Sequence, residues 1–213
     1  MKKVVLLLVA TVAVGTGTAF AATLSVGSHH LWTGSQTLTK ATCTLTGSTA
    51  TTDTYVDENK PTTSFGTTTT ALVQPDSGSR KWMLVRFDLS TCSIPTTGGA
   101  DTATLSLRVT TAPKTDRVLA MTPVAATWSN TTTWNSVPSF AATTTTTFHT
   151  GTANNATVSI PVTIDVDDLI KSSTANYGWR ISDTGSAATQ DTTTFATSNA
   201  TSNRPTLVID YEK

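Results

Sequence analysis

The chain has 213 residues, and 51 of them are threonine. Charged residues make up 13% of the sequence and the formal net charge is zero. So few lysines and arginines exclude a protein that binds nucleic acid by neutralising phosphates. Threonine is a weak helix former, and its β-branched side chain suits a pleated sheet. The composition therefore predicts a neutral, all-β, extracellular domain.

The first 21 residues have the three parts of a secretory signal peptide. Lys2 and Lys3 give a positive start, and residues 4–14 form an apolar run. The segment ends in Ala19-Phe20-Ala21, a small-x-small cleavage site. The run is shorter than the about 20 apolar residues that cross a bilayer. We therefore expect residues 1–21 to be cleaved and the mature chain to be secreted or held at the cell surface, without a membrane span.

Two cysteines remain in the mature chain, Cys43 and Cys92. Export permits a disulfide, and with two cysteines its pairing is unambiguous if it forms. The alternative is a pair of separate buried thiols. The sequence has no C-x-x-C motif, so nothing indicates a redox centre.

Five segments alternate apolar and polar residues with a period of two, which is typical of half-buried strands. They are residues 81–89, 102–109, 156–164, 177–181 and 207–211. Weaker strands are predicted at 23–27 and 42–46. Pro161 falls on the outer face of its strand, which predicts a sheet edge or a bulge. These short strands predict a single β-sandwich of jelly-roll type.

The pattern also predicts how the chain is organised around this sandwich. The only helix is predicted at 166–172, with Asp167 capping its N-terminus. Residues 22–50, rich in Thr, Ser and Gly, form an extension ahead of a domain over 51–213. The extension either donates a strand to the open sheet edge of a neighbouring copy or folds back onto its own domain.

The three histidines, His29, His30 and His149, offer no recognisable active site. The sequence contains neither H-E-x-x-H nor G-x-S-x-G. His29 and His30 lie in a Gly/Ser-rich stretch, and His149 has no acidic neighbour in sequence. We interpret all three as solvated side chains.

Two acidic clusters are the remaining candidates for catalysis or metal binding. They are Asp53 with Asp57 and Glu58, and Asp165 with Asp167 and Asp168. Paired carboxylates can hydrolyse glycosidic bonds or bind Ca²⁺. Helix capping explains the second cluster more simply, and a solvated turn explains Asp57 and Glu58. We therefore predict no catalytic residue and no metal ligand. Calcium stays open as a cofactor, and a polysaccharide hydrolase or lyase stays open as an activity.

Basic residues are the predicted ligand-binding side chains: Arg86, Arg108, Arg180 and Lys114. The three arginines lie on predicted outer strand faces, and arginine binds carboxylates through two parallel hydrogen bonds. They therefore predict an acidic polysaccharide as the ligand. The alternative is structural pairing, such as Arg86 with Asp88.

Trp128 and Trp134 can be interpreted in two ways. Their rings could stack on sugars, but tryptophans in a short loop beside strands more often belong to the core. We favour the core for both.

Several pieces of sequence occur in an order shared with a known family. They are residues 54–58 with Phe65-Gly66, residues 84–89 with Ile94-Pro95, Ala103-Thr104-Leu105, Trp128-Ser129 with Thr133-Trp134-Asn135 and Pro138, Ile164-Asp165-Val166, Asn176-Tyr177-Gly178, and Phe195 with Arg204-Pro205-Thr206-Leu207 and Tyr211. This order resembles the DNRLRE-domain family, which overlaps the disaggregatase-related repeats and a family of carbohydrate-binding modules. Asn130 stands where the family often has Glu, and the string that gives the family its name is absent.

The resemblance implies a secreted β-sandwich that, in some relatives, binds polysaccharides such as alginate. We therefore predict a non-catalytic protein that binds extracellular polysaccharide. The alternative is a structural subunit of the cell envelope, matrix or a surface filament, in which copies of the chain associate. Three sequons, at Asn130, Asn155 and Asn199, permit glycosylation in a host that has the machinery.

Overall fold

The computed structural model describes residues 39–75, 78–171, 175–185 and 191–213. The chain divides into two compact units, and residues 38–213 form the unit that contains all of the described residues. The predicted signal peptide, the predicted strand at 23–27, and His29 and His30 lie outside them.

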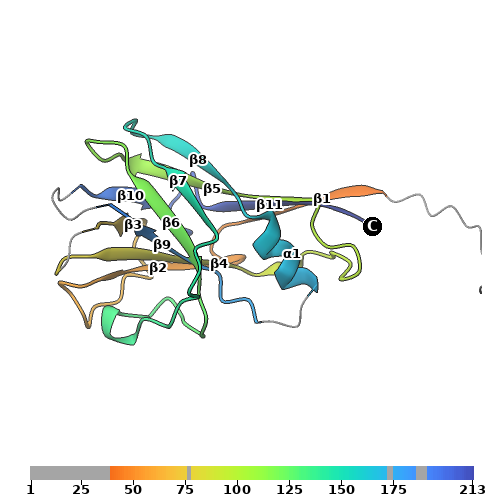
Figure 1. Cartoon of the computed structure of the whole chain (residues 1–213), viewed down its shortest axis with the longest axis horizontal. Coiled ribbons are helices and arrows are strands. Elements are labelled where there is room, and N and C mark those ends of the chain that lie inside the picture. Colours follow the sequence, from red (N-terminus) through yellow and green to blue (C-terminus); the bar gives the residue numbers. More distant parts are fainter. Residues whose placement is uncertain (1–38, 76–77, 172–174, 186–190) are drawn as a thin grey trace, which may run out of the picture. The chain divides into compact units, whose positions relative to one another are not determined.

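Eleven strands of the described residues form two antiparallel sheets that pack face to face (Figure 1). In the first sheet, called sheet A, the order is β1-β11-β5-β10-β3, and β8 pairs separately with β5. The bounds are β1 Lys40–Thr46, β3 Thr70–Val73, β5 Thr102–Thr111, β8 Ala156–Pro161, β10 Thr193–Ala196 and β11 Thr206–Glu212.

The second sheet, called sheet B, has the order β2-β4-β9-β6-β7. Its bounds are β2 Thr51–Asp57, β4 Lys81–Phe87, β6 Val118–Pro123, β7 Thr146–His149 and β9 Trp179–Asp183. The two sheets confirm the predicted all-β sandwich. Short helical segments join the strands: η1 Leu89–Thr91, η2 Trp134–Ser136 and α1 Thr163–Lys171. In the described part of the chain, no helix has the length and apolar character to cross a membrane.

Alternating side chains along the strands build the core between the two sheets. Met83, Val85 and Phe87 of β4 are at most 1% exposed, as their spacing predicts. Leu105 and Leu107 of β5 belong to the same buried cluster from the side of sheet A. Each such side chain contributes roughly 1.5–3 kcal/mol by leaving water. Threonine occupies many of the outward positions, where it favours the extended backbone without adding charge.

Strand β1 runs antiparallel to β11 along its whole length. Lys40 lies opposite Glu212, and Thr46 lies opposite Thr206. The strand predicted at 42–46 is therefore present, and residues 40–46 fold back onto the sandwich. For these residues the structure matches the second arrangement predicted for the extension, whereas residues 22–38 lie outside the described part of the chain.

The helix begins earlier than the sequence predicts. The alternation suggests a strand that continues to Ile164, but β8 ends at Pro161 and α1 starts at Thr163. Pro161 does not interrupt the pairing with β5, because the N–H of the next residue, Val162, still donates to the Ala103 carbonyl at 2.9 Å. The helix begins directly after Val162, and Ile164 is 77% exposed. The prediction that Asp167 caps the helix is wrong, since Asp167 lies inside it. β8 pairs with β5 alone among the described strands, as the predicted sheet edge at Pro161 requires.

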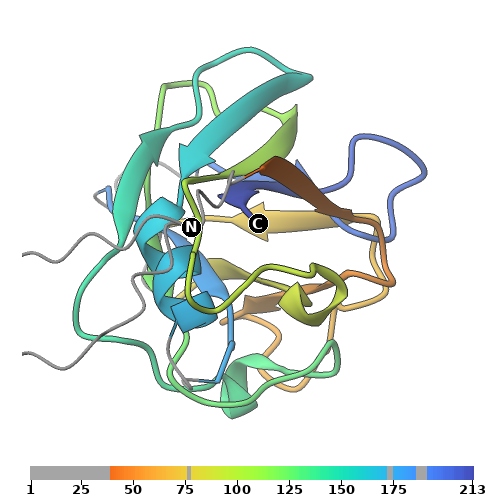
Figure 2. The same ribbon diagram turned by 90° about the vertical axis from the view of Figure 1, so that its right-hand side faces the viewer.

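The disulfide predicted between Cys43 and Cys92 is present, with the two Cα atoms 5.9 Å apart. It joins β1 of sheet A to the segment that follows η1. Viewed from one end, this segment and α1 lie side by side near the C-terminus (Figure 2). The Asp167 carboxylate links them, because it accepts hydrogen bonds from the Ala100 N–H at 3.0 Å and Lys171 Nζ at 2.9 Å.

Candidate functional site

A long loop packs against the outer face of sheet B. The loop joins β6 to β7 and spans residues 124–145. Leu84 points away from the main core, yet it is fully buried because Val124 and Trp128 cover it in a second apolar cluster. Trp128 is 6% exposed, and its indole N–H donates to the Tyr177 carbonyl at 2.6 Å. Trp128 is therefore a core residue, as predicted, although the loop that carries it is long and not short; Trp134, for which the core was also favoured, is only half-buried.

Arg180 lies on this outer face, between two aromatic rings. It sits opposite Leu84 in the pairing of β9 with β4. Its guanidinium carbon is 4.2 Å from the ring centre of Phe140 and 5.0 Å from that of Trp82. One N–H₂ group donates to the Thr122 hydroxyl at 3.3 Å, whereas the buried Nε has no partner. Burial lowers the pKa of Arg180, because removing water disfavours the charged guanidinium.

Arg86 lies close to Arg180 on the same face. The register places Arg180 opposite Leu84, so Arg86 is its diagonal neighbour, at a Cα separation of roughly 7–8 Å in an antiparallel pair. The guanidinium carbon of Arg86 is 5.4 Å from the ring centre of Trp128. Among the described residues, neither arginine forms a close ion pair with a carboxylate. The predicted Arg86–Asp88 alternative is reduced to a weak effect: hydrogen bonds from Ser90 lower the pKa of Asp88 most, and the charge of Arg86 adds a smaller contribution.

A polar groove of about 370 Å³ opens beside Arg86. The residues that line it come from the turn before β2, from β2, from β4 and from the approach to β9: Thr49, Ala50, Thr52, Arg86, Phe87, Asp88 and Asn176. The Asn176 amide is held in place, since it donates to the Phe87 carbonyl at 2.7 Å and accepts from the Gly178 N–H. Hydroxyl, amide and guanidinium groups therefore share one recess.

A third arginine, Arg80, was not identified from the sequence. Arg80 stacks on Trp134, and its guanidinium carbon is 5.3 Å from the ring centre. The ring centres of Trp134 and Trp82 are 4.5 Å apart. Unlike Arg86 and Arg180, Arg80 has a carboxylate partner, Glu58, at 2.8 Å. Its hydrogen bonds lower the pKa of Glu58 to about 2. Their opposite charges are the only signal in the sequence that could have suggested this pair.

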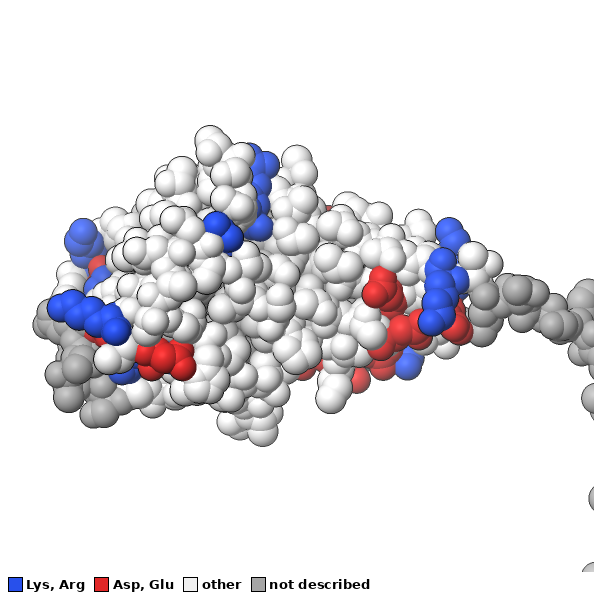
Figure 3. Space-filling view, turned by 90° about the horizontal axis from the view of Figure 1, so that it is seen from above, with Lys and Arg blue, Asp and Glu red and all other residues white. Residues whose placement is uncertain are grey.

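The other two predicted ligand residues lie elsewhere. Arg108 is on the outer face of β5 in sheet A, where it donates to the Thr157 hydroxyl at 3.2 Å. Lys114 is exposed in the segment after β5. The surface seen from the side of β5 and β8 is largely uncharged, and most of its charged side chains lie toward the two ends (Figure 3). The structure thus brings together Arg86 and Arg180, but not Arg108 or Lys114.

The acidic residues of β2 do not converge on one point. Asp53 is 2% exposed and accepts hydrogen bonds from the N–H and hydroxyl of Ser198. Asp57 Oδ2 lies 3.8 Å from Lys81 Nζ. Glu58, which directly follows β2, forms an ion pair with Arg80. Each carboxylate already has its own protein partner.

The second acidic cluster is also divided. Asp165 accepts hydrogen bonds from the Trp179 indole N–H and the Thr145 hydroxyl, whereas Asp168 is exposed. The described residues contain no group of three His, Cys, Asp or Glu side chains that could hold a metal ion. His149 is exposed, as predicted, but its Nδ1 lies 2.6 Å from Asp116, a partner 33 residues away in sequence.

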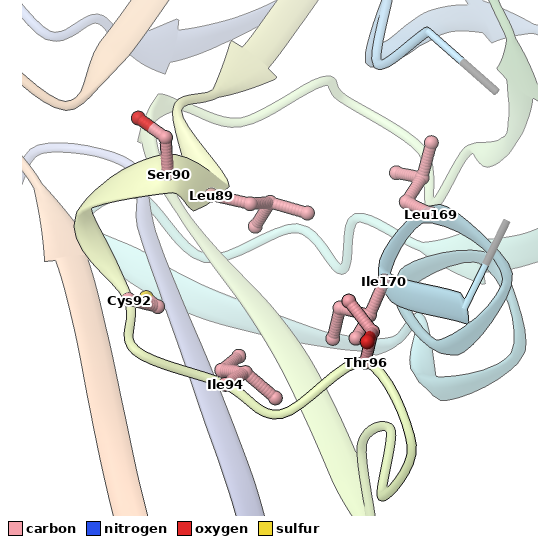
Figure 4. Close-up of a pocket in the computed structure, with 7 residues that line it drawn as sticks. All are labelled: Leu89, Ser90, Cys92, Ile94, Thr96, Leu169 and Ile170. Atoms are coloured by element: carbon pink, nitrogen blue, oxygen red, sulfur yellow. The ribbon is translucent and has the colours of Figure 1, made fainter. Parts of the chain in front are cut away.

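An apolar pocket of about 220 Å³ lies at the end of the sandwich that carries α1 (Figure 4). It is lined by Leu89, Ser90, Cys92, Ile94, Thr96, Leu169 and Ile170. None of the predicted ligand-binding residues reaches it. The predicted ligand-binding residues that the structure brings together, Arg86 and Arg180, lie on the outer face of sheet B and not in this pocket.

Comparison with known proteins identifies the family of the chain. No curated protein matches the chain. The model of carbohydrate-binding module family 96 matches residues 44–211, from within β1 to within β11. This range covers both sheets, the loop over sheet B and the groove beside Arg86. The chain belongs to carbohydrate-binding module family 96.

Proposed function

We propose that this chain is a secreted, non-catalytic protein that binds an acidic extracellular polysaccharide through Arg86 and Arg180. Family membership supports carbohydrate as the ligand class. The observation that carries the acidic specificity is the diagonal placement of these two arginines on adjacent strands, with neither in an ion pair with a described carboxylate. A uronate carboxylate can accept two parallel hydrogen bonds from one guanidinium group.

The rings around these arginines support the same ligand. Trp82 and Phe140 hold Arg180 from two sides, and Trp128 holds Arg86 from one. Such stacking restricts the side chains before the ligand arrives, so less conformational entropy is lost on binding. The groove beside Arg86 adds hydroxyl and amide groups that could bind sugar hydroxyls.

The test compares polygalacturonate with its methyl-esterified form by calorimetry, since esterification removes the charge and keeps the sugar ring. Arg86→Gln and Arg180→Gln should each weaken binding to polygalacturonate by roughly tenfold or more, because a hydrogen bond to a charged group contributes about 1.5–3 kcal/mol. Lys40→Gln, a charge change at the exposed start of β1, is the matched control and should leave affinity unchanged.

Three outcomes would count against the proposal. Equal affinity for the charged and esterified polymers would remove the acidic specificity. Loss of binding only in Arg108→Gln or Lys114→Gln would move the site away from the Arg86–Arg180 pair. Release of shorter sugars from the polymer during incubation would show that the protein is an enzyme.

A further inference from the structure

A lysine, a glutamine and an aspartate meet where β3 gives way to β4. Gln74 and Lys81 face each other across the connecting segment, and their backbones exchange hydrogen bonds in both directions at 3.1 Å. Gln74 is 6% exposed. The side chains of Lys81 and Asp57 are 14% and 6% exposed. A primary amine, a carboxamide and a carboxylate are thus held together with little access to water, outside the proposed sugar site.

The side chains are arranged around the Gln74 carboxamide. Lys81 Nζ donates to Gln74 Oε1 at 2.9 Å, and Asp57 Oδ2 lies 3.8 Å from the same nitrogen. The Thr192 hydroxyl donates to Gln74 Oε1 from β10's side, also at 2.9 Å. Gln74 Nε2 donates to the Ser79 hydroxyl at 3.2 Å. The carbonyl oxygen therefore has two donors, and the amide nitrogen has a separate partner.

We propose that Lys81 and Gln74 react to form an intramolecular isopeptide bond. Asp57 accepts a proton from the Lys81 ammonium, and the free amine attacks Gln74 Cδ. The N–Cδ bond forms as the carbonyl oxygen becomes an oxyanion, which the Thr192 hydroxyl stabilises. The Cδ–Nε2 bond then breaks. The leaving nitrogen takes a proton from the attacking nitrogen and the proton held by Asp57, and departs as ammonium.

The step is balanced without another reactant. One ammonium and one carboxamide become one secondary amide and one ammonium ion, and nothing is oxidised or reduced. Holding amine and carbonyl in contact removes the entropic cost of bringing them together. Exclusion of water also strengthens the interaction of the oxyanion with its donor.

The bond would join the two sheets. β3 belongs to sheet A and β4 to sheet B. The end of β3 and the start of β4 lie at the end of the sandwich away from β1 (Figure 1), whereas the Cys43–Cys92 disulfide ties β1 to the segment beyond η1. An exported sandwich with both links would be covalently closed at two ends.

Peptide mapping of the purified full chain tests the proposal. Trypsin cleaves after Arg80, so an unreacted protein yields residues 41–80 and 82–86 as separate peptides after reduction of the disulfide. A reacted protein yields one branched peptide that joins 41–80 to 81–86, lighter than the sum of its linear parts by one ammonia. We expect the branched peptide in the wild type, and we expect intact mass under denaturing conditions to show the same loss.

Two variants identify the reacting groups. Lys81→Arg keeps the positive charge and removes the amine, so its intact mass should equal the sequence mass apart from the disulfide. Asp57→Asn removes the proton acceptor and should leave the linear peptides. Separate linear peptides from the wild type would overturn the proposal. A loss of ammonia that persists in Lys81→Arg and vanishes in Thr192→Val would also overturn it, because an ester to Thr192 would then be the product.

Discussion

Asp53 and Ser198 lie 145 residues apart in sequence and bond to each other inside the sandwich. The Ser198 N–H donates to one carboxylate oxygen at 2.6 Å, and its hydroxyl donates to the other at 3.0 Å. These hydrogen bonds link β2, an edge strand of sheet B, to the turn that follows β10 in sheet A. They lower the pKa of Asp53, but burial raises it more, so the pKa stands at about 6 instead of 3.8.

The raised pKa of Asp53 predicts that the protein loses stability as pH rises from about 4 to about 7. The folded state holds the proton more tightly than the unfolded state. The stabilisation is therefore complete below 3.8 and is lost as pH passes about 6. The full effect is on the order of 2–3 kcal/mol. It is measured as the free energy of unfolding in urea at a series of pH values.

Asp53→Asn isolates this effect, because asparagine resembles the protonated acid and does not titrate. The difference in unfolding free energy between wild type and Asp53→Asn should change across this pH range. Asp168→Asn, on the exposed face of α1, serves as the control and should not show that change. Parallel pH profiles for the wild type and Asp53→Asn would contradict the prediction.

Trp128→Ala is expected to destabilise the protein by about 3–5 kcal/mol, the usual cost of removing a large buried ring. The variant exposes Leu84 and leaves the Tyr177 carbonyl without its donor. It also removes the ring on which Arg86 rests, so affinity for polygalacturonate should fall. Trp134→Ala removes a half-exposed ring and should cost less. Urea unfolding followed by circular dichroism measures both, and equal losses would argue against a core role for Trp128.

Replacing both Cys43 and Cys92 with serine should lower stability by about 2–4 kcal/mol while the sandwich still folds. The link restricts the unfolded chain between residues 49 positions apart. Both cysteines pack against the main core only as partly buried residues, so the buried cluster itself is retained. Near-native circular dichroism with a lower urea midpoint is the expected result. An unfolded double variant would show that folding itself requires the disulfide.

Calcium removal should leave polysaccharide binding unchanged, because the proposed site relies on guanidinium groups. The affinity for polygalacturonate is measured in EDTA and again with added calcium, with Arg180→Gln as the reference for a damaged site. A loss of affinity in EDTA that calcium restores would point to a metal-bridged complex.

Local patterns were enough to predict most of the strands. The alternation over 102–109 and 81–87 reports which side chains are buried, because neighbouring residues of a strand point to opposite faces. The same logic failed at 162–164. Val162, which precedes the helix, and Val166 within it are both buried, so the alternation of β8 runs on to Val162 but not beyond it. Tertiary packing decided the boundary there, because the helix buries Val166 in the main core while Val162 still hydrogen-bonds to Ala103.

The sequence by itself determined the fold class, the disulfide partners and the outward position of Arg86 and Arg180, because each depends on periodicity or on a count. Only the tertiary structure decided that these two arginines are diagonal neighbours, that Trp128 is covered, and that β1 pairs with β11. Those facts depend on the register between strands far apart in the chain. The alternation excludes a slip of one residue, but a slip of two residues leaves it unchanged, so it does not identify which residues lie opposite each other. The chain is rich in threonine and has few charged residues. Only the structural neighbours of each arginine distinguish a candidate ligand-binding side chain from one that pairs within the protein.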